Sequence, residues 1–81
     1  MEIIITTHAQ RQLKKLTEQA RQELKPAILG LSEWPEVENV KKLQGRPDYR
    51  LRVGRYRVVF EFSEGKIYIT QVLLRDDRTY T

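Results

Sequence analysis

The side chains best suited to chemistry are arginines that recur at alternate positions in the second half of the chain. Arg50 and Arg52 are separated by one residue, and Arg57 follows after the pair Gly54-Arg55. A two-residue link with glycine first is typical of a type II′ hairpin. Such a turn fixes the register, so that Arg52 lies opposite Arg57 and Arg50 lies on the same face.

Three guanidinium groups on one sheet face are suited to binding phosphate, because each donates two parallel hydrogen bonds to its oxygens. Like charges directly opposite each other destabilise a sheet by about 0.2–1 kcal/mol. A fold under selection for stability alone would therefore place a different residue type at one of these positions. The alternative is that the three side chains extend separately into water.

The positive charge of the chain is concentrated around these arginines. The 81 residues carry a net charge of +4, but residues 41–57 alone carry seven basic and one acidic side chain. Such a block in an otherwise near-neutral chain indicates a polyanion as partner, although a solvated basic face is the alternative. The candidate residues for binding such a polyanion, a nucleic acid, are Lys41, Lys42, Arg46, Arg50 and Arg55.

A second group of reactive side chains lies near the C-terminus. Arg75 and Arg78 flank two aspartates, and Tyr80 follows. The tyrosine could stack on a base or supply a phenol for proton transfer. The alternative is a hydrophobic plug at the edge of the sheet.

Composition excludes several kinds of site. The chain has no cysteine, which removes disulfides, thiolate zinc sites and cysteine nucleophiles, and favours a cytoplasmic protein. It has one histidine, and its carboxylates do not cluster with it in the sequence, so we expect no metal site and no cofactor. No apolar run is long enough to span a membrane.

The elements that position the arginines follow from the hydrophobic periodicity. Apolar residues alternate in the strands and recur every three or four residues in the helices. We predict one α+β domain, residues 1–81, with an N-terminal strand and a two-helix hairpin packed on one face of a mainly antiparallel four-stranded sheet (β-α-α-β-β-β). The predicted elements are a strand at 2–6, helices at 8–16 and 18–33, a polar loop at 35–47, and strands at 49–53, 56–62 and 67–75.

Two segments resemble the RelE/ParE superfamily of bacterial toxins from type II toxin–antitoxin modules, in particular the RelE-like members. The first is KKLQGRPDYRLRVGRYRVVFEF, residues 41–62, and the second is RDDRTY, residues 75–80. The predicted element order agrees with that family. The resemblance implies a ribosome-dependent mRNA endonuclease that inhibits translation and needs no metal, with a 2′-hydroxyl attacking the scissile phosphate.

The resemblance also assigns roles to residues. The basic pair on the second strand falls at Arg50 and Arg52, and the phosphate-stabilising arginine falls at Arg57. A late arginine falls at Arg75 or Arg78. The implied catalytic residues are Arg52, Arg57, Arg75, Arg78 and Tyr80.

This sequence departs from RelE in having arginines where RelE has lysines on the second strand. An arginine effectively cannot lose its proton. Tyr80 is then the expected general base, with Asp76, Asp77 and Glu61 as fallbacks. Strand positioning falls to Arg50 together with Lys41 or Lys42.

The superfamily leaves other functions open. One alternative is a ParE-like toxin that poisons gyrase, and another is a non-catalytic RNA- or ribosome-binding protein of the same fold. For a toxin of either kind, mRNA endonuclease or gyrase poison, the resemblance implies a heteromeric complex with a cognate antitoxin. We expect that antitoxin to cover part of the apolar helix surface or to displace the segment bearing Tyr80.

Overall fold

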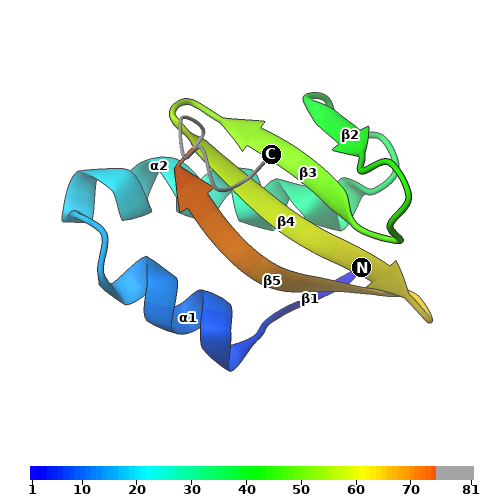
Figure 1. Ribbon diagram of the computed structural model, residues 1–81, viewed down its shortest axis with the longest axis horizontal. Coiled ribbons are helices and arrows are strands. Elements are labelled where there is room, and N and C mark those ends of the chain that lie inside the picture. Colours follow the sequence, from blue (N-terminus) through cyan, green and yellow to red (C-terminus); the bar gives the residue numbers. More distant parts are fainter. Residues whose placement is uncertain (75–81) are drawn as a thin grey trace.

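The computed structural model describes residues 1–74, in which two helices and a short 3-10 helix pack against a five-stranded sheet (Figure 1). The predicted fold class is confirmed. The elements are β1 (Glu2–Ile5), α1 (Thr7–Lys14), α2 (Glu18–Leu29), η1 (the 3-10 helix, Gly30–Glu33), β2 (Val40–Lys42), β3 (Tyr49–Val53), β4 (Tyr56–Ser63) and β5 (Lys66–Leu74).

Both helices begin at a threonine whose side chain caps the first turn. The Oγ1 atom of Thr6 accepts from the backbone N–H of Ala9 at 3.3 Å, and that of Thr17 accepts from Ala20 at 3.1 Å. Each cap satisfies one of the backbone donors that a helix start leaves without an intrahelical partner. The predicted break between the two helices therefore coincides with a cap.

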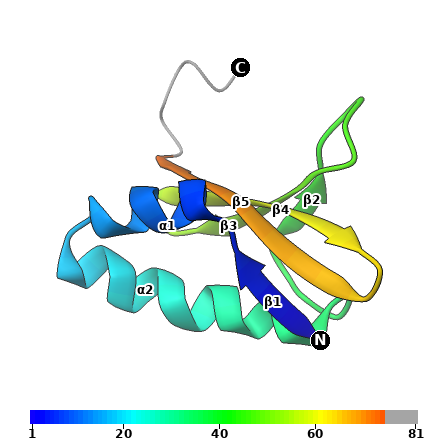
Figure 2. The same ribbon diagram turned by 90° about the horizontal axis from the view of Figure 1, so that it is seen from below.

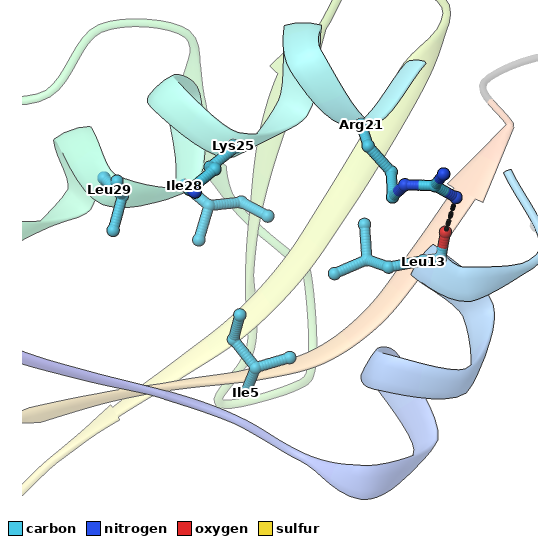
Figure 3. Close-up of a pocket in the computed structure, with 6 residues that line it drawn as sticks. All are labelled: Ile5, Leu13, Arg21, Lys25, Ile28 and Leu29. Atoms are coloured by element: carbon cyan, nitrogen blue, oxygen red, sulfur yellow. Dashed lines mark hydrogen bonds between the residues drawn. The ribbon is translucent and has the colours of Figure 1, made fainter. Parts of the chain in front are cut away.

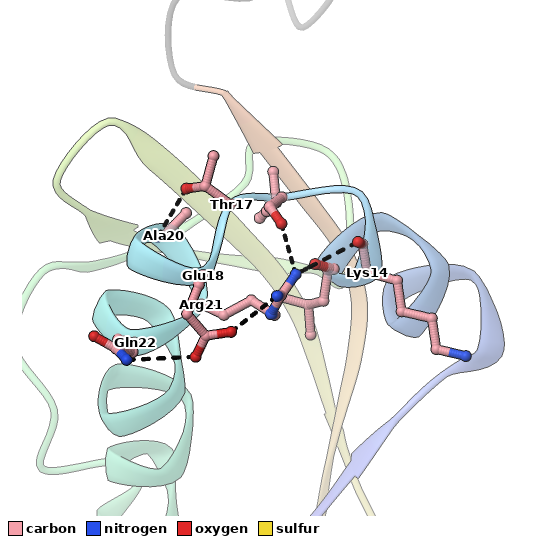
Figure 4. A network of polar contacts seen from close by, with 8 residues as sticks. Lys14, Thr17, Glu18, Ala20, Arg21 and Gln22 are labelled. Atoms are coloured by element: carbon pink, nitrogen blue, oxygen red, sulfur yellow. Dashed lines mark hydrogen bonds and ion pairs between the residues drawn. The ribbon is translucent and has the colours of Figure 1, made fainter.

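Arg21 joins the two helices (Figure 4). Its Nη1 atom donates to the carbonyl oxygens of Leu16 at 2.6 Å, Leu13 at 3.3 Å and Lys14 at 3.4 Å, which lie where α1 ends. Its Nη2 atom pairs with Glu18 at 2.9 Å. The hydrogen bond and the charge of Arg21 hold the pKa of Glu18 below its usual 4.5.

The strands lie in the order β1-β5-β4-β3-β2, with β1 parallel to β5 and every other pair antiparallel. The sequence prediction of four strands missed β2, which lies within the segment predicted as a loop. Three residues are too few to show an alternating pattern. Asn39, with φ of +65°, precedes β2, and Val40 pairs with Leu51 of β3.

The core lies between the sheet and the helices. Phe60 of β4 is fully buried, with its ring stacked on Tyr49 at a centroid distance of 5.5 Å and edge-on to Trp34 at 5.4 Å. The Gln12 side chain of α1 accepts from the backbone N–H of Val72 at 2.6 Å, which ties α1 to β5. Within residues 1–74, no helix is long and apolar enough to cross a bilayer.

The arrangement leaves one sheet face free of helices. Figure 2 shows α2 lying across one face of the sheet and α1 alongside β5, whereas no helix of the described chain covers the other face. We call this other face the open face. The predicted functional residues on the strands can therefore be sorted by the face on which they lie.

Candidate nucleic-acid interface

The β3–β4 hairpin positions the central arginines of the open face. Gly54 has φ of +54° and Arg55 has a negative φ, the sign pattern of a type II′ turn. The register that follows sets Arg52 opposite Arg57, as predicted. Arg50 lies two residues from Arg52 and therefore on the same face.

Arg52 and Arg57 form a non-hydrogen-bonded pair of the antiparallel ladder, the type in which the two residues lie closer together. The backbone N–H of Arg52 donates to the carbonyl of Asn39 at 3.0 Å, on the side away from β4. Residues opposed without mutual backbone bonds have Cα atoms about 4.5 Å apart, nearer than hydrogen-bonded pairs. Arg52 is exposed and Arg57 is half-buried. Within residues 1–74, no carboxylate forms an ion pair with Arg52.

β2 adds a fourth cation to this face. Lys41 pairs directly with Arg50, so its side chain lies beside the Arg50–Arg52 row. A hollow of about 180 Å³ opens between β2 and β3 at this point. Its lining residues are Asn39, Val40, Lys41, Arg50 and Arg52.

The centre of the open face is apolar. Val59 pairs with Arg50 and lies between the positions of Arg57 and Glu61 on β4, yet it is only 2% exposed. The sequence pattern predicts it on the arginine face but gives no sign that it is buried. Val59 therefore lies buried among the positions of four cationic residues on this face. We call these four residues, Lys41, Arg50, Arg52 and Arg57, the cationic face.

Three of the predicted RNA-binding residues lie away from the cationic face. Lys42 follows Lys41 in β2 and so points to the opposite side of the sheet. Arg46 forms an ion pair of 2.5 Å with the buried Asp48, which engages its charge within the loop. Arg55 is the second residue of the hairpin turn.

The surroundings of Arg55 explain the glycine beside it. Arg55 lines a hollow of about 210 Å³ next to α2, together with Glu23 and Tyr56. A Cβ atom at Gly54 would lie 2.7 Å from the Oε2 atom of Glu23. A side chain at position 54 would therefore require the flexible end of Glu23 to shift, and the positive φ would strain it in addition.

The remaining predicted catalytic residues fall outside the described residues. These are Arg75, Arg78 and Tyr80, with the fallback bases Asp76 and Asp77. Within residues 1–74, no group of three histidine, aspartate or glutamate side chains is placed to hold a metal ion.

A third hollow, of apolar character, lies on the helical side of the molecule. It has a volume of about 250 Å³ and opens between α1, α2 and β1 (Figure 3). Leu29 at its rim is 55% exposed, and Lys25 is exposed beside it. The lining residues are Ile5, Leu13, Arg21, Lys25, Ile28 and Leu29.

The described residues of the cationic face can stabilise negative charge but supply no obvious proton acceptor. Four cations that converge on one side of a sheet attract a polyanion and can fix a phosphate group by paired hydrogen bonds. Arginine stays protonated under physiological conditions. A reaction that removes a proton therefore cannot use any of the three arginines as its base.

Comparisons with known proteins agree with this geometry. Residues 3–78 match the family described as the ParE toxin of the type II toxin–antitoxin system parDE. A comparison with curated proteins found no significant match.

The fold is that of solved RelE toxins. In a RelB–RelE complex from Methanococcus jannaschii, the matching chain is 23% identical with a TM-score of 0.79, and 95% of each chain is covered. In the RelBE2 complex from Mycobacterium tuberculosis, the values are 24% and 0.80, with 91% of this chain and 96% of the other covered. The isolated RelE toxin of E. coli is 22% identical with a TM-score of 0.78, over 98% of this chain and 89% of the other. The chain belongs to the RelE/ParE superfamily, and it is a toxin of a type II toxin–antitoxin system.

Proposed function

We propose that this toxin acts in the cytoplasm as a ribosome-dependent mRNA endonuclease that inhibits translation without a metal or cofactor. The observation that carries the proposal is the sheet register. It sets Arg52 opposite Arg57 and continues the row through Arg50 and Lys41 on the open face. Guanidinium and ammonium groups that share one sheet face attract a phosphodiester strand and can bind its phosphate oxygens by paired hydrogen bonds.

The reaction that fits this face is an internal transesterification. The 2′-hydroxyl oxygen attacks the adjacent phosphorus while the bond from phosphorus to the 5′-oxygen breaks. The 2′-hydroxyl loses its proton and the leaving 5′-oxygen gains one, which gives a 2′,3′-cyclic phosphate and a 5′-hydroxyl. Negative charge grows on the non-bridging oxygens, where a fixed cation acts most strongly in the transition state.

Arg57, flanked by Arg52, is the residue we assign to that charge. Removing one preorganised donor of this kind commonly costs about 2.7–4 kcal/mol of transition-state stabilisation. Arg50 and Lys41 would hold the neighbouring phosphates and fix the strand. They contribute by positioning rather than by touching the reacting atoms.

The proton transfers fall to the C-terminal residues. We assign the general base to Tyr80 and the proton donor for the leaving oxygen to Arg75 or Arg78. We assign Glu61 no part in this step, because its Cα atom lies about 13 Å along β4 from that of Arg57. Asp76 and Asp77 remain the alternatives to Tyr80.

Primer extension on cellular messages after brief induction tests the proposal. We expect cuts within translated codons that disappear when translation is blocked beforehand. Arg57→Ala and Tyr80→Phe should lose these cuts, whereas Arg11→Ala, an exposed arginine on α1, should keep them. Equal toxicity of all four proteins, without cuts, would refute the proposal.

Gyrase poisoning is the second candidate, because the family match itself is to ParE toxins. That function predicts double-strand breaks in DNA and induction of the SOS response, with intact messages. Growth arrest without cut messages or broken DNA would indicate a binding protein instead.

The partner we infer is a cognate antitoxin, as the relatives from Methanococcus jannaschii and Mycobacterium tuberculosis were solved with theirs. The apolar hollow of Figure 3 suits an amphipathic segment whose apolar side chains enter it and whose carboxylates meet Lys25. Mixing with the product of the neighbouring small reading frame should raise the melting temperature. Leu29→Asp should reduce that rise, whereas Leu74→Asp, at an exposed leucine where β5 ends, should not.

A further inference from the structure

The open face has a second hollow, beyond Val59 and away from the arginines. It has a volume of about 460 Å³ and lies over β4 and β5 where they approach their connecting turn. Glu61 of β4 pairs directly with Tyr68 of β5, and Tyr68 is flanked on its other side by Ile4 of β1. The lining residues are Thr6, Glu61, Ser63, Glu64, Tyr68 and Thr70.

A β-bulge shapes this hollow. The register between β4 and β5 shifts between Val59 and Phe60, which leaves Thr70 as the extra residue of β5. The hydroxyl of Thr70 donates to the carbonyl of Val59 at 3.2 Å. Bulges bend and twist a strand and re-aim its side chains. Here the bulge lies between the Glu61–Tyr68 pair and the cationic face, and its extra residue Thr70 lines the hollow.

The chemistry of this hollow differs from that of the cationic face. Tyr68 is half-buried and offers an aromatic surface, and Glu61 is half-buried and has no cation paired with it within residues 1–74. A carboxylate repels phosphate but accepts hydrogen bonds from the N–H groups of a base edge. An RNA strand that continued from the arginines along β4 would therefore turn a base, not a phosphate, toward this hollow.

We propose that the hollow between Glu61 and Tyr68 is a nucleobase subsite that prefers guanine. Guanine is the base whose Watson–Crick edge carries two adjacent N–H donors, N1–H and N2–H, which match the two oxygens of one carboxylate. Tyr68 supplies the stacking surface, as aromatic side chains do for unpaired bases. This inference rests on the proposed RNA cleavage and adds to it a determinant of where the strand is cut.

The test uses the full chain in a cell-free translation reaction, with reporter messages that vary each nucleotide around one strong cut. The readout is the ratio of cutting between bases at a given position, which is independent of the overall rate. The wild type should prefer guanine at one fixed position by about tenfold. Glu61→Gln should shift the preference at that position toward adenine, because an amide pairs with the adenine edge.

Matched variants separate recognition from folding. Tyr68→Phe keeps the ring and should keep the preference, whereas Tyr68→Leu should flatten it. Glu33→Gln removes an exposed carboxylate of η1 and should change nothing. Melting temperatures show whether each variant is folded.

The outcomes distinguish this inference from the proposed function. Absence of cuts by the wild type would refute RNA cleavage and the subsite with it. Cuts by the wild type that keep the same base ratios in Glu61→Gln would refute the subsite alone. Unchanged ratios combined with weaker antitoxin binding by Glu61→Gln would assign the hollow to a basic side chain of the partner and would also overturn the inference.

Discussion

Replacing Arg52 with glutamine should stabilise the fold while it damages function. Arg52 is exposed, lies opposite Arg57, and forms no ion pair with a carboxylate within residues 1–74. Removal of one of two opposed charges should recover about 0.5 kcal/mol. In a domain of this size, that corresponds to a rise in melting temperature of about 2–4 °C.

Thermal unfolding at two ionic strengths tests whether charge is the cause. The Debye length falls from about 10 Å at 0.1 M salt to about 3 Å at 1 M. The stability gained by Arg52→Gln should therefore shrink toward zero in concentrated salt. Arg52→Lys keeps the charge and should show no gain at either ionic strength.

The same variant should lose RNA cleavage by about a hundredfold, because it removes a cation beside the reacting phosphate. A variant that is more stable but less active would show that the arginine pair is kept for function. Arg52→Gln that is less stable at low salt, or equally active, would refute the reasoning.

Three further variants test the fold around the site. Phe60→Ala empties a fully buried position and should cost about 3–5 kcal/mol in chemical denaturation, and a loss below about 1 kcal/mol would contradict the assigned core. Gly54→Ala should lower the melting temperature because of its positive φ and its contact with Glu23, and a second change, Glu23→Ala, should restore part of the loss; no recovery would rule out the contact. Since folding lowers the pKa of Glu18, its contribution is present above about pH 4.5 and is lost as the pH falls through the folded value, so Glu18→Gln should be less stable than the wild type near neutral pH and equal to it at strongly acidic pH. A difference that persists in acid would contradict the ion pair with Arg21.

The parts of the fold that the sequence predicts are those with strong local signals. Thr6 and Thr17 are good capping residues, and each begins a helix. The Gly54-Arg55 turn fixes the pairing of Arg52 with Arg57 because a two-residue hairpin allows only one register. These features depend on a few neighbouring residues and can be inferred without the rest of the chain.

The parts that were missed depend on tertiary contacts. β2 is too short for an alternating pattern, and it forms because β3 offers an edge to which Val40 and its neighbours pair. Val59 is buried on the open face although its neighbours in the pattern are charged. The ion pair of Arg46 with Asp48 could have been suspected from their spacing, since the two residues are close in sequence and opposite in charge.

In the candidate site too, features set by local sequence signals were predicted, and features set by tertiary contacts were missed. The row of Arg50, Arg52 and Arg57 follows from strand periodicity and one turn, so sequence reasoning placed it correctly. The choice of Lys41 over Lys42 needed the register of β2. The hollow beside Glu61 and Tyr68 depends on a bulge, for which the sequence has no local signal.

The most direct test of the central claim is single-turnover cleavage of a ribosome-bound message by purified toxin, with the ends of the products identified. We expect a 2′,3′-cyclic phosphate and a 5′-hydroxyl, with the rate lowered by about 100- to 1,000-fold in Arg57→Ala and unchanged in Arg11→Ala. An Arg57→Ala protein that cuts as fast as the wild type would contradict the claim that the cationic face stabilises the reacting phosphate.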